Sequence, residues 1–266
     1  MTIVDAQVHA WHDGQSTGHH RRSPIDAPVL QAEMASAGVD RVVLVPPLWD
    51  PGANAYSLSL AQAEPARYAV MGVLDPELPD APERLRHWRD TPGMRAVRFL
   101  LNTPQRIAPL LQGKMEALWP EAERQGLTVA LLVPGGLAHV DRIAGEHPGL
   151  RIIVDHLGVP RGASGPAAFD HLAQLLALAR HPNVHVKAAG VGDYALDPYP
   201  FRSLDTPLRQ VFEAFGAERV IWASDLSRLH HAYAQCVRHF SQLSWLEDEQ
   251  RDKVMGGNIL RLIDWS

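Results

Sequence analysis

Four side chains suited to chemistry lie within or just after four separate apolar runs of the chain: His9, Arg98, His156 and Asp225. Histidine titrates near neutral pH and is the commonest metal ligand in proteins. A carboxylate can take up a proton or bind a metal ion, and an arginine can pair with an anion. These residue types indicate acid–base or metal-assisted chemistry, provided that the fold brings them to one place.

Side chains alternate along a strand, and this alternation divides the opening segment of the chain into a polar and an apolar set. The polar set has four members: Asp5, Gln7, His9 and Trp11. Because polar groups are costly against an apolar helix layer, we expect this set to line the interior of the fold. The same reasoning places Arg98 and Asn102 inside, and Val97 and Phe99 outside.

Eight short runs rich in Val, Ile and Leu are predicted as strands: 3–9, 41–45, 68–74, 96–101, 128–133, 151–155, 184–188 and 219–223. Segments with helical spacing alternate with them: 28–37, 57–63, 81–90, 114–125, 137–147, 167–180, 204–215 and 230–243, followed by short helices near 247–255 and 258–263. The alternation predicts an α/β fold, a single-domain (β/α)8 TIM barrel over residues 1–266, with reactive groups at the carboxyl ends of the strands. A doubly wound open sheet is the main rival, but no glycine-rich fingerprint follows any strand.

Length and composition narrow the class of protein. The chain has 266 residues, of which 46% are hydrophobic and 21% charged, as in an ordinary globular protein. Its formal net charge of -5 argues against nucleic-acid binding, and no apolar run is long enough to span a membrane. Cys236 is the single cysteine, and the N-terminal segment lacks the pattern of a signal peptide, so we expect a cytoplasmic protein. The sequence leaves homo-oligomerisation open.

Five segments carry recognisable motifs, and four of them contain the residues named above. In chain order they are Val4–Trp11, Pro92–Phe99, Asp155–Pro160, Trp222–Asp225 and Gly257–Leu262. Together they resemble the motifs of the amidohydrolase-2 (amidohydrolase-related) family, and the second resembles a Gly-Val-Arg-Phe element of its lactonase-like branch. The first is similar to the strand-1 pattern Asp-Ala-His-x-His, and the third to a His-x-Gly-x-Pro element. The resemblance covers the whole chain and implies a TIM-barrel hydrolase of the amidohydrolase superfamily.

The resemblance also implies roles for the matching positions. His9 matches the second histidine of the strand-1 pattern, and His156 matches the histidine of the His-x-Gly element. Asp225 matches the last-strand aspartate, which in the family acts as metal ligand, general base or both. Arg98 matches an arginine that grips a substrate carboxylate in the lactonase branch. Four residues are predicted to contact the substrate: Gln7, Trp11, Arg98 and Asn102.

Two departures from the family pattern concern a metal ion. Gln7 stands where the first strand-1 histidine is usual, and the segment 127–134 contains no histidine. A catalytic zinc typically has three protein ligands, which His9, His156 and Asp225 could supply, but the neutral amide of Gln7 is a weak ligand. Because the lactonase branch includes members that need no metal, we expect no cofactor, with one divalent cation, Zn or Mn, as the alternative.

The predicted function is therefore hydrolysis of a small carboxylate-bearing lactone or related ester. Asp225 is expected to act as general base on water, with its pKa raised by partial burial, while His9 and His156 polarise the carbonyl. Two alternatives are a metal-dependent decarboxylase of the same family and a catalytically inactive, ligand-binding barrel. The loop around His19, residues 14–22, is expected to lie in solvent, with a lid over the substrate as the alternative.

Overall fold

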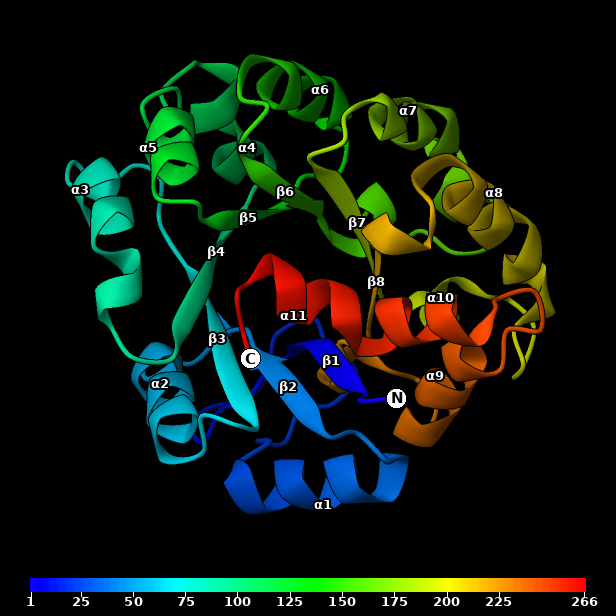
Figure 1. Cartoon of the computed structure of the whole chain (residues 1–266). Helices are drawn as coiled ribbons and strands as arrows, with labels where there is room; N and C mark the ends of the chain where they lie inside the picture. Colours follow the sequence, from blue (N-terminus) through cyan, green and yellow to red (C-terminus); the bar gives the residue numbers. More distant parts are fainter.

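The computed structural model describes residues 1–266 and shows eight parallel strands, wound in chain order into a nearly closed barrel (Figure 1). The strands are β1 (Val4–Val8), β2 (Arg41–Leu44), β3 (Tyr68–Val73), β4 (Met94–Leu100), β5 (Thr128–Leu132), β6 (Arg151–Val154), β7 (Val184–Ala189) and β8 (Val220–Ala223). Just beyond β8, the Asp225 N–H donates a hydrogen bond to the Gln7 carbonyl of β1, 3.0 Å away. The predicted single-domain (β/α)8 TIM barrel is confirmed.

Helices surround the barrel, and the last one lies across one of its ends (Figure 1). They are α1 (Ala27–Ala37), α2 (Ala53–Ala63), α3 (Ala81–Arg86), α4 (Pro104–Leu111), α5 (Leu118–Arg124), α6 (Leu137–Glu146), α7 (Leu172–Ala177), α8 (Asp205–Phe215), α9 (Tyr233–Ser241), α10 (Asp248–Asp252) and α11 (Asn258–Leu262). None of them combines the length and the apolar character that a membrane crossing needs.

Helix α4 was not predicted: it lies between the predicted strand 96–101 and the predicted helix 114–125. The Thr103 side chain caps it by accepting a hydrogen bond from the Arg106 N–H at 3.3 Å, and Pro104 occupies its first turn, where a missing N–H costs little. Pro109 lies within the helix. Because an internal proline removes a helical hydrogen bond, it normally argues against a helix, and here the tertiary packing overrides that preference.

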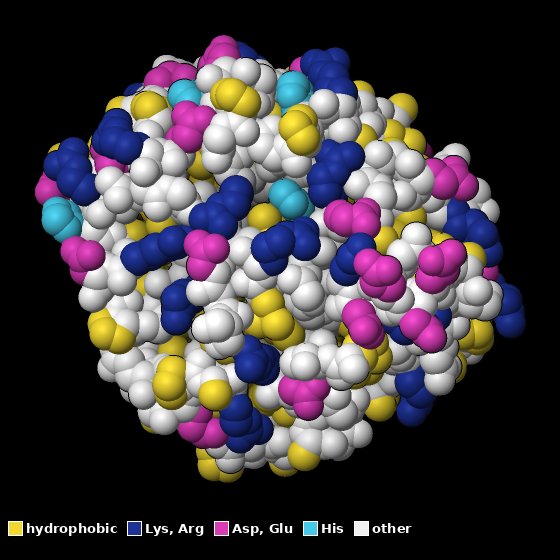
Figure 2. All heavy atoms as spheres, in the orientation of Figure 1, with side chains coloured by type: hydrophobic (Ala, Val, Ile, Leu, Met, Phe, Trp, Pro, Cys, Tyr) yellow, Lys and Arg dark blue, Asp and Glu magenta, His cyan; other side chains and the backbone are white.

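The hydrophobic core has two layers, one on each side of the sheet. The inner layer receives residues from all eight strands and is closed by α11 and the residues after it, among them Ile259, Leu262 and Trp265. The Trp265 indole donates a hydrogen bond to the Pro65 carbonyl at 2.9 Å. Figure 2 shows this end of the barrel covered by side chains, with acidic residues gathered over α10. This closure leaves the carboxyl ends of the strands, at the opposite end, as the place for chemistry.

One expectation for β1 is wrong: the polar set does not share a face. The register of β1 against β2 shifts after Asp5, which marks a bulge. Before the bulge, Val4 and Ala6 belong to the inner core layer, so Asp5 points outward. After it, Gln7 and His9 line the interior cavity. The extra residue resets the alternation, which strict period-two reasoning cannot anticipate.

Asp5 instead fastens the end of β8 from outside the barrel. Its carboxylate accepts hydrogen bonds from the Ser224 N–H at 2.9 Å, from the Ser224 hydroxyl and from the Tyr233 hydroxyl of α9 at 2.6 Å. Burial raises the pKa of Asp5 to about 6, although these hydrogen bonds act in the opposite direction. The contacts fix the backbone of the residue that precedes Asp225.

Two buried histidines away from the cavity make the fold sensitive to acid. Burial lowers the pKa of His185 on β7 and of His239 on α9 to about 4. Because an unfolded histidine titrates near 6.5, the unfolded chain binds more protons between these values, and stability should fall as the pH drops through this window. Each histidine that is protonated only in the unfolded chain lowers the free energy of unfolding by about 1.4 kcal/mol per pH unit in this window. Below pH 6, the raised pKa of Asp5 offsets part of this loss, because there the folded chain binds the extra proton.

Urea unfolding at pH 7 and at pH 5 measures this loss. The variant His185→Gln should show a shallower decrease in the free energy of unfolding than the wild-type chain. An equally steep decrease in both proteins would show that His185 does not carry the effect.

Candidate active site

A cavity of about 870 Å³ opens at the carboxyl ends of the strands. Four of its lining residues come from three regions far apart in the sequence: Gln7 and His9, His156, and Asp225. Because all eight strands run parallel, their carboxyl ends meet at one rim of the barrel. The structure thus brings the three predicted catalytic residues, His9, His156 and Asp225, into one site.

The His9 ring is oriented by the backbone and faces Asp225. Its Nδ1 lies 2.6 Å from the Val45 carbonyl, an acceptor, so Nδ1 carries the proton. Its Nε2 lies 3.2 Å from Asp225 Oδ1. With the proton on Nδ1, a neutral His9 presents a lone pair toward a carboxylate. This arrangement is favourable only when a cation or an additional proton lies between the two groups.

His156 lies on the other side of the same carboxylate, and two groups compete for its Nδ1. The Ala189 carbonyl accepts at 3.2 Å, whereas Arg228 Nη1 donates at 3.4 Å. In the first arrangement the Nε2 lone pair accepts from the Gln7 amide at 3.2 Å, and in the second the ring proton sits on Nε2, 3.7 Å from Asp225 Oδ2. Burial lowers the pKa of His156 to about 3, which Asp225 only partly counteracts, so the ring is neutral at pH 7.

Asp225 is ionised, contrary to the expectation that burial raises its pKa. Burial does act in that direction, but the close approach of His9 and the nearby rings of His19 and His156 outweigh it, and the pKa of Asp225 lies well below its ordinary value. The expectation was wrong because it counted the desolvation of the carboxylate without the histidines around it. The group is therefore an available proton acceptor and a negatively charged ligand at neutral pH.

The backbone at two of these residues is held in the left-handed region, with φ of 55° at His156 and 51° at Asp225. Such values are uncommon outside glycine, although Asp and His tolerate them better than most residues. Each residue lies two positions after the last residue of its strand, where the turn redirects the side chain into the cavity. Local strain of this kind is concentrated at functional sites.

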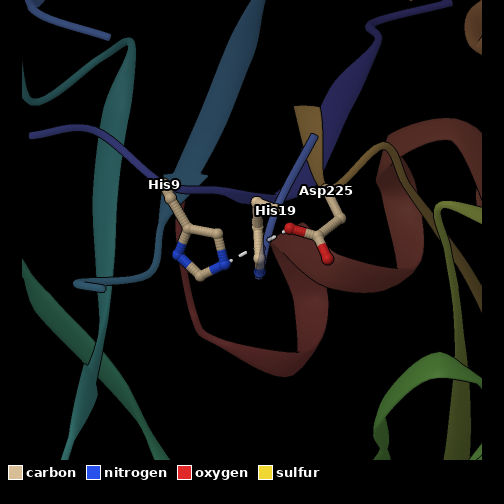
Figure 3. A group of neighbouring side chains, drawn as sticks. All are labelled: His9, His19 and Asp225. Atoms are coloured by element: carbon tan, nitrogen blue, oxygen red, sulfur yellow. Dashed lines mark ion pairs between the residues drawn. The ribbon is translucent and has the colours of Figure 1, made fainter. Parts of the chain in front are cut away.

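His19 is a site residue that the sequence analysis assigned to a solvated loop. The structure folds the loop 14–22 over the rim, and His19 becomes half-buried beside His9 and Asp225 (Figure 3). Its Nδ1 lies 2.8 Å from the Ser227 hydroxyl, and the Arg21 N–H donates to the Ser227 carbonyl at 2.8 Å. No spacing rule ties a loop histidine to a strand-end motif, so only the folded loop reveals this contact.

The remaining predicted contacts are distributed unevenly. Arg98 and Asn102 line the cavity, but Arg98 Nε also donates to Asp155 Oδ2 at 2.6 Å. Trp11 does not line the cavity: it is fully buried and packs edge-to-face on Trp49, with ring centroids 5.3 Å apart. Trp49 is the tryptophan that faces the cavity, and Trp11 supports it from behind.

A TIM barrel with two imidazoles and an ionised carboxylate at its carboxyl rim defines a class of acid–base or metal-assisted enzymes. Comparison with known sequences makes the class specific: a family model described as Amidohydrolase matches residues 4–265. The chain therefore belongs to the amidohydrolase family, and it is a hydrolase, as predicted.

Individual relatives agree with this family. The chain is 30% identical to an L-fucono-1,5-lactonase of Burkholderia ambifaria, over 96% of this chain and 93% of the relative, which is consistent with the lactonase-like branch. Among solved structures, an amidohydrolase of Burkholderia multivorans with bound zinc has a TM-score of 0.85, with 21% identity over the full length of both chains. A Pseudomonas putida protein described as a 2-pyrone-4,6-dicarboxylic acid hydrolase has a TM-score of 0.76, with 21% identity over 100% of this chain and 98% of that one.

Proposed function

We propose that this enzyme hydrolyses the ring ester of a small lactone that carries a carboxylate group. The observation that carries the proposal is the position of ionised Asp225 between His9 and His156, 3.2 Å and 3.7 Å away, inside a cavity large enough for a small molecule. The similarity to an L-fucono-1,5-lactonase supports a lactone as the substrate class.

In the proposed reaction, Asp225 takes a proton from water while the water oxygen attacks the lactone carbonyl carbon. The ring C–O bond then breaks, the former ring oxygen takes up the proton, and a hydroxy acid is released. Neutral His156, in the arrangement that places its proton on Nε2, donates a hydrogen bond toward the developing oxyanion, and His9 borders the same position. A divalent ion, when bound, would make the water more acidic and thereby assist a base whose pKa is as low as that of Asp225.

Positive charge in the cavity supports an anionic substrate. Its lining contains four arginines, Arg98, Arg106, Arg161 and Arg228. It contains only two carboxylates, those of Asp193 and Asp225. Arg228 is half-buried and lies over the Tyr194 ring, with its guanidinium carbon 5.2 Å from the ring centroid, and this stacking fixes its orientation. A guanidinium that is held in place loses little freedom when it forms a bidentate pair with a carboxylate.

The variant Arg228→Met should raise KM for a carboxylate-bearing lactone by about tenfold or more, because a charge-assisted hydrogen bond contributes about 1.5–3 kcal/mol. It should change KM for a neutral lactone much less. Steady-state kinetics on both substrates measures the difference, and Arg22→Gln, in an exposed residue outside the cavity, is the matched control. An equal effect of Arg228→Met on both substrates would contradict a carboxylate-binding role.

A pH-indicator assay tests the proposed function itself. Lactones that include L-fucono-1,5-lactone and 2-pyrone-4,6-dicarboxylate are incubated with the enzyme, with and without Zn²⁺ or Mn²⁺, and each turnover should release one acid group. Release of carbon dioxide from an aromatic carboxylate would instead support the decarboxylase. Binding of such acids without any turnover would support the ligand-binding barrel.

A further inference from the structure

Three potential metal ligands converge at the cavity in a combination that the strand motifs do not contain (Figure 3). One atom each of His9, His19 and Asp225 lies within 4.8 Å of both others. His9 comes from the end of β1 and Asp225 from the end of β8, whereas His19 comes from the loop over the rim. The sequence motifs indicate a different set, in which His156 is the third ligand.

The hydrogen-bond partners of these residues are arranged as metal-binding histidines require. His9 donates its Nδ1 proton to the Val45 carbonyl, which leaves the Nε2 lone pair directed at the site. His19 has the Ser227 hydroxyl on Nδ1, and its Nε2 makes no hydrogen bond. Asp225 Oδ1 is buried without a hydrogen-bond partner, and His9 Nε2 lies 3.2 Å from it. A lone pair and a carboxylate that face one another are stabilised by a cation between them.

The spacing is also that of a coordination shell. Ligands at about 2.0–2.1 Å from a tetrahedral zinc ion lie about 3.3 Å from each other. His9 Nε2 and Asp225 Oδ1 are 3.2 Å apart, which is close to this separation, and a small movement of the loop would bring His19 to the third position. His156 fits less well, because Gln7 occupies its Nε2 at 3.2 Å.

We propose that His9, His19 and Asp225 bind one Zn²⁺ ion, and that His19 makes the loop 14–22 part of the metal site. Two imidazoles and a carboxylate are a ligand set that zinc accepts, and the fourth position faces the cavity, where water can bind. His19 thus supplies the third ligand that Gln7 cannot. The ion fastens the loop to the rim, so that an ordered loop and a bound metal depend on each other. The inference does not depend on the identity of the substrate.

Zinc binding by the purified, EDTA-treated chain tests the proposal by isothermal titration calorimetry with ZnCl₂ alone. The wild-type chain should bind one equivalent, and Zn²⁺ should raise its Tm. His19→Ala should bind at least about 100-fold more weakly, because loss of an outer-shell partner alone costs about 10–100-fold. Co²⁺, titrated as a spectroscopic substitute, should give visible absorption bands in the wild-type chain that His19→Ala lacks.

The neighbouring histidine provides the matched control. His20 is exposed and stacks on His230, with ring centroids 4.4 Å apart, so His20→Ala should keep the zinc affinity of the wild-type chain. Circular dichroism confirms that each variant is folded, and His19→Gln replaces His19→Ala if the latter is not. Equal zinc affinity in His19→Ala and in the wild-type chain would overturn the proposal. So would the absence of zinc binding by the wild-type chain, or a loss of binding in His156→Ala that exceeds the loss in His19→Ala. None of these results would by itself contradict lactone hydrolysis, which the acid-release assay measures separately.

Discussion

The variant Asp225→Asn should lower kcat on any lactone that the wild-type chain hydrolyses by about 10³-fold or more. The carboxylate is the proton acceptor of the proposed reaction, and a positioned general base contributes about 10²–10⁴-fold. The amide has nearly the same shape as the carboxylate but cannot take up the proton. Asparagine also tolerates the left-handed backbone at this position, where φ is 51°, so the variant should fold. Initial rates over pH 5–9, with circular dichroism on the same samples, measure the effect.

A second cavity carboxylate serves as the control for this variant. Asp193 also lines the cavity, but its carboxylate accepts from the His230 N–H at 3.0 Å and has no contact with His9 or His156. Asp193→Asn should therefore reduce kcat by less than about tenfold. Full activity in folded Asp225→Asn would remove Asp225 from the mechanism. Equal losses in the two variants would show that charge in the cavity, and not a particular base, controls the rate.

The largest expected effect on stability comes from a buried ion network next to the catalytic site. Asp155 is fully buried, with Lys187 Nζ 2.8 Å from Oδ1 and Arg98 Nε 2.6 Å from Oδ2. Burial by itself raises the pKa of Asp155, but the two cations outweigh it and hold the pKa well below its ordinary value. Asp155→Asn should lower the free energy of unfolding by about 3–5 kcal/mol, because two cations would remain buried without their anion.

Urea unfolding at pH 7 measures this loss, and a double variant shows its cause. Lys187 is itself completely buried, so Asp155→Asn combined with Lys187→Met should recover part of the stability. Glu64→Gln is the matched control: it breaks a half-exposed ion pair with Arg67, 3.0 Å long, and should cost less than about 1 kcal/mol. Stability of Asp155→Asn within 1 kcal/mol of the wild-type value would show that the network is not stabilising.

Much of the barrel could be predicted from the sequence because each strand is buried on both faces. A parallel strand of this kind is a continuous apolar run, and the ends of all eight predicted runs lie within two residues of the observed strands. The strand-end motifs then located His9, His156 and Asp225 at one rim, since parallel strands end together. Arg98 inside the barrel and Phe99 outside it follow from simple alternation, and both are confirmed.

Other features depend on contacts between distant segments, which local patterns do not contain. The β1 bulge leaves Asp5 facing outward, where its carboxylate accepts from Ser224 and Tyr233, more than two hundred residues away in the chain. His19 reaches the site because its loop bonds to Ser227. The ionisation of Asp225 depends on three histidines whose relative distances only the folded chain fixes. In each case the residue's neighbours in the folded chain, and not its local sequence, determine what it does.

The position of α11 has a consequence for the synthesis of the protein. The inner core layer is filled from all eight strands, but Ile259, Leu262 and Trp265, close to the end of the chain, seal it. While a ribosome still holds these residues in its exit tunnel, the emerging polypeptide cannot complete that layer, even when every strand has already been translated. Stable burial of the barrel interior therefore waits until α11 and the residues after it have emerged, and until then the inner layer stays exposed.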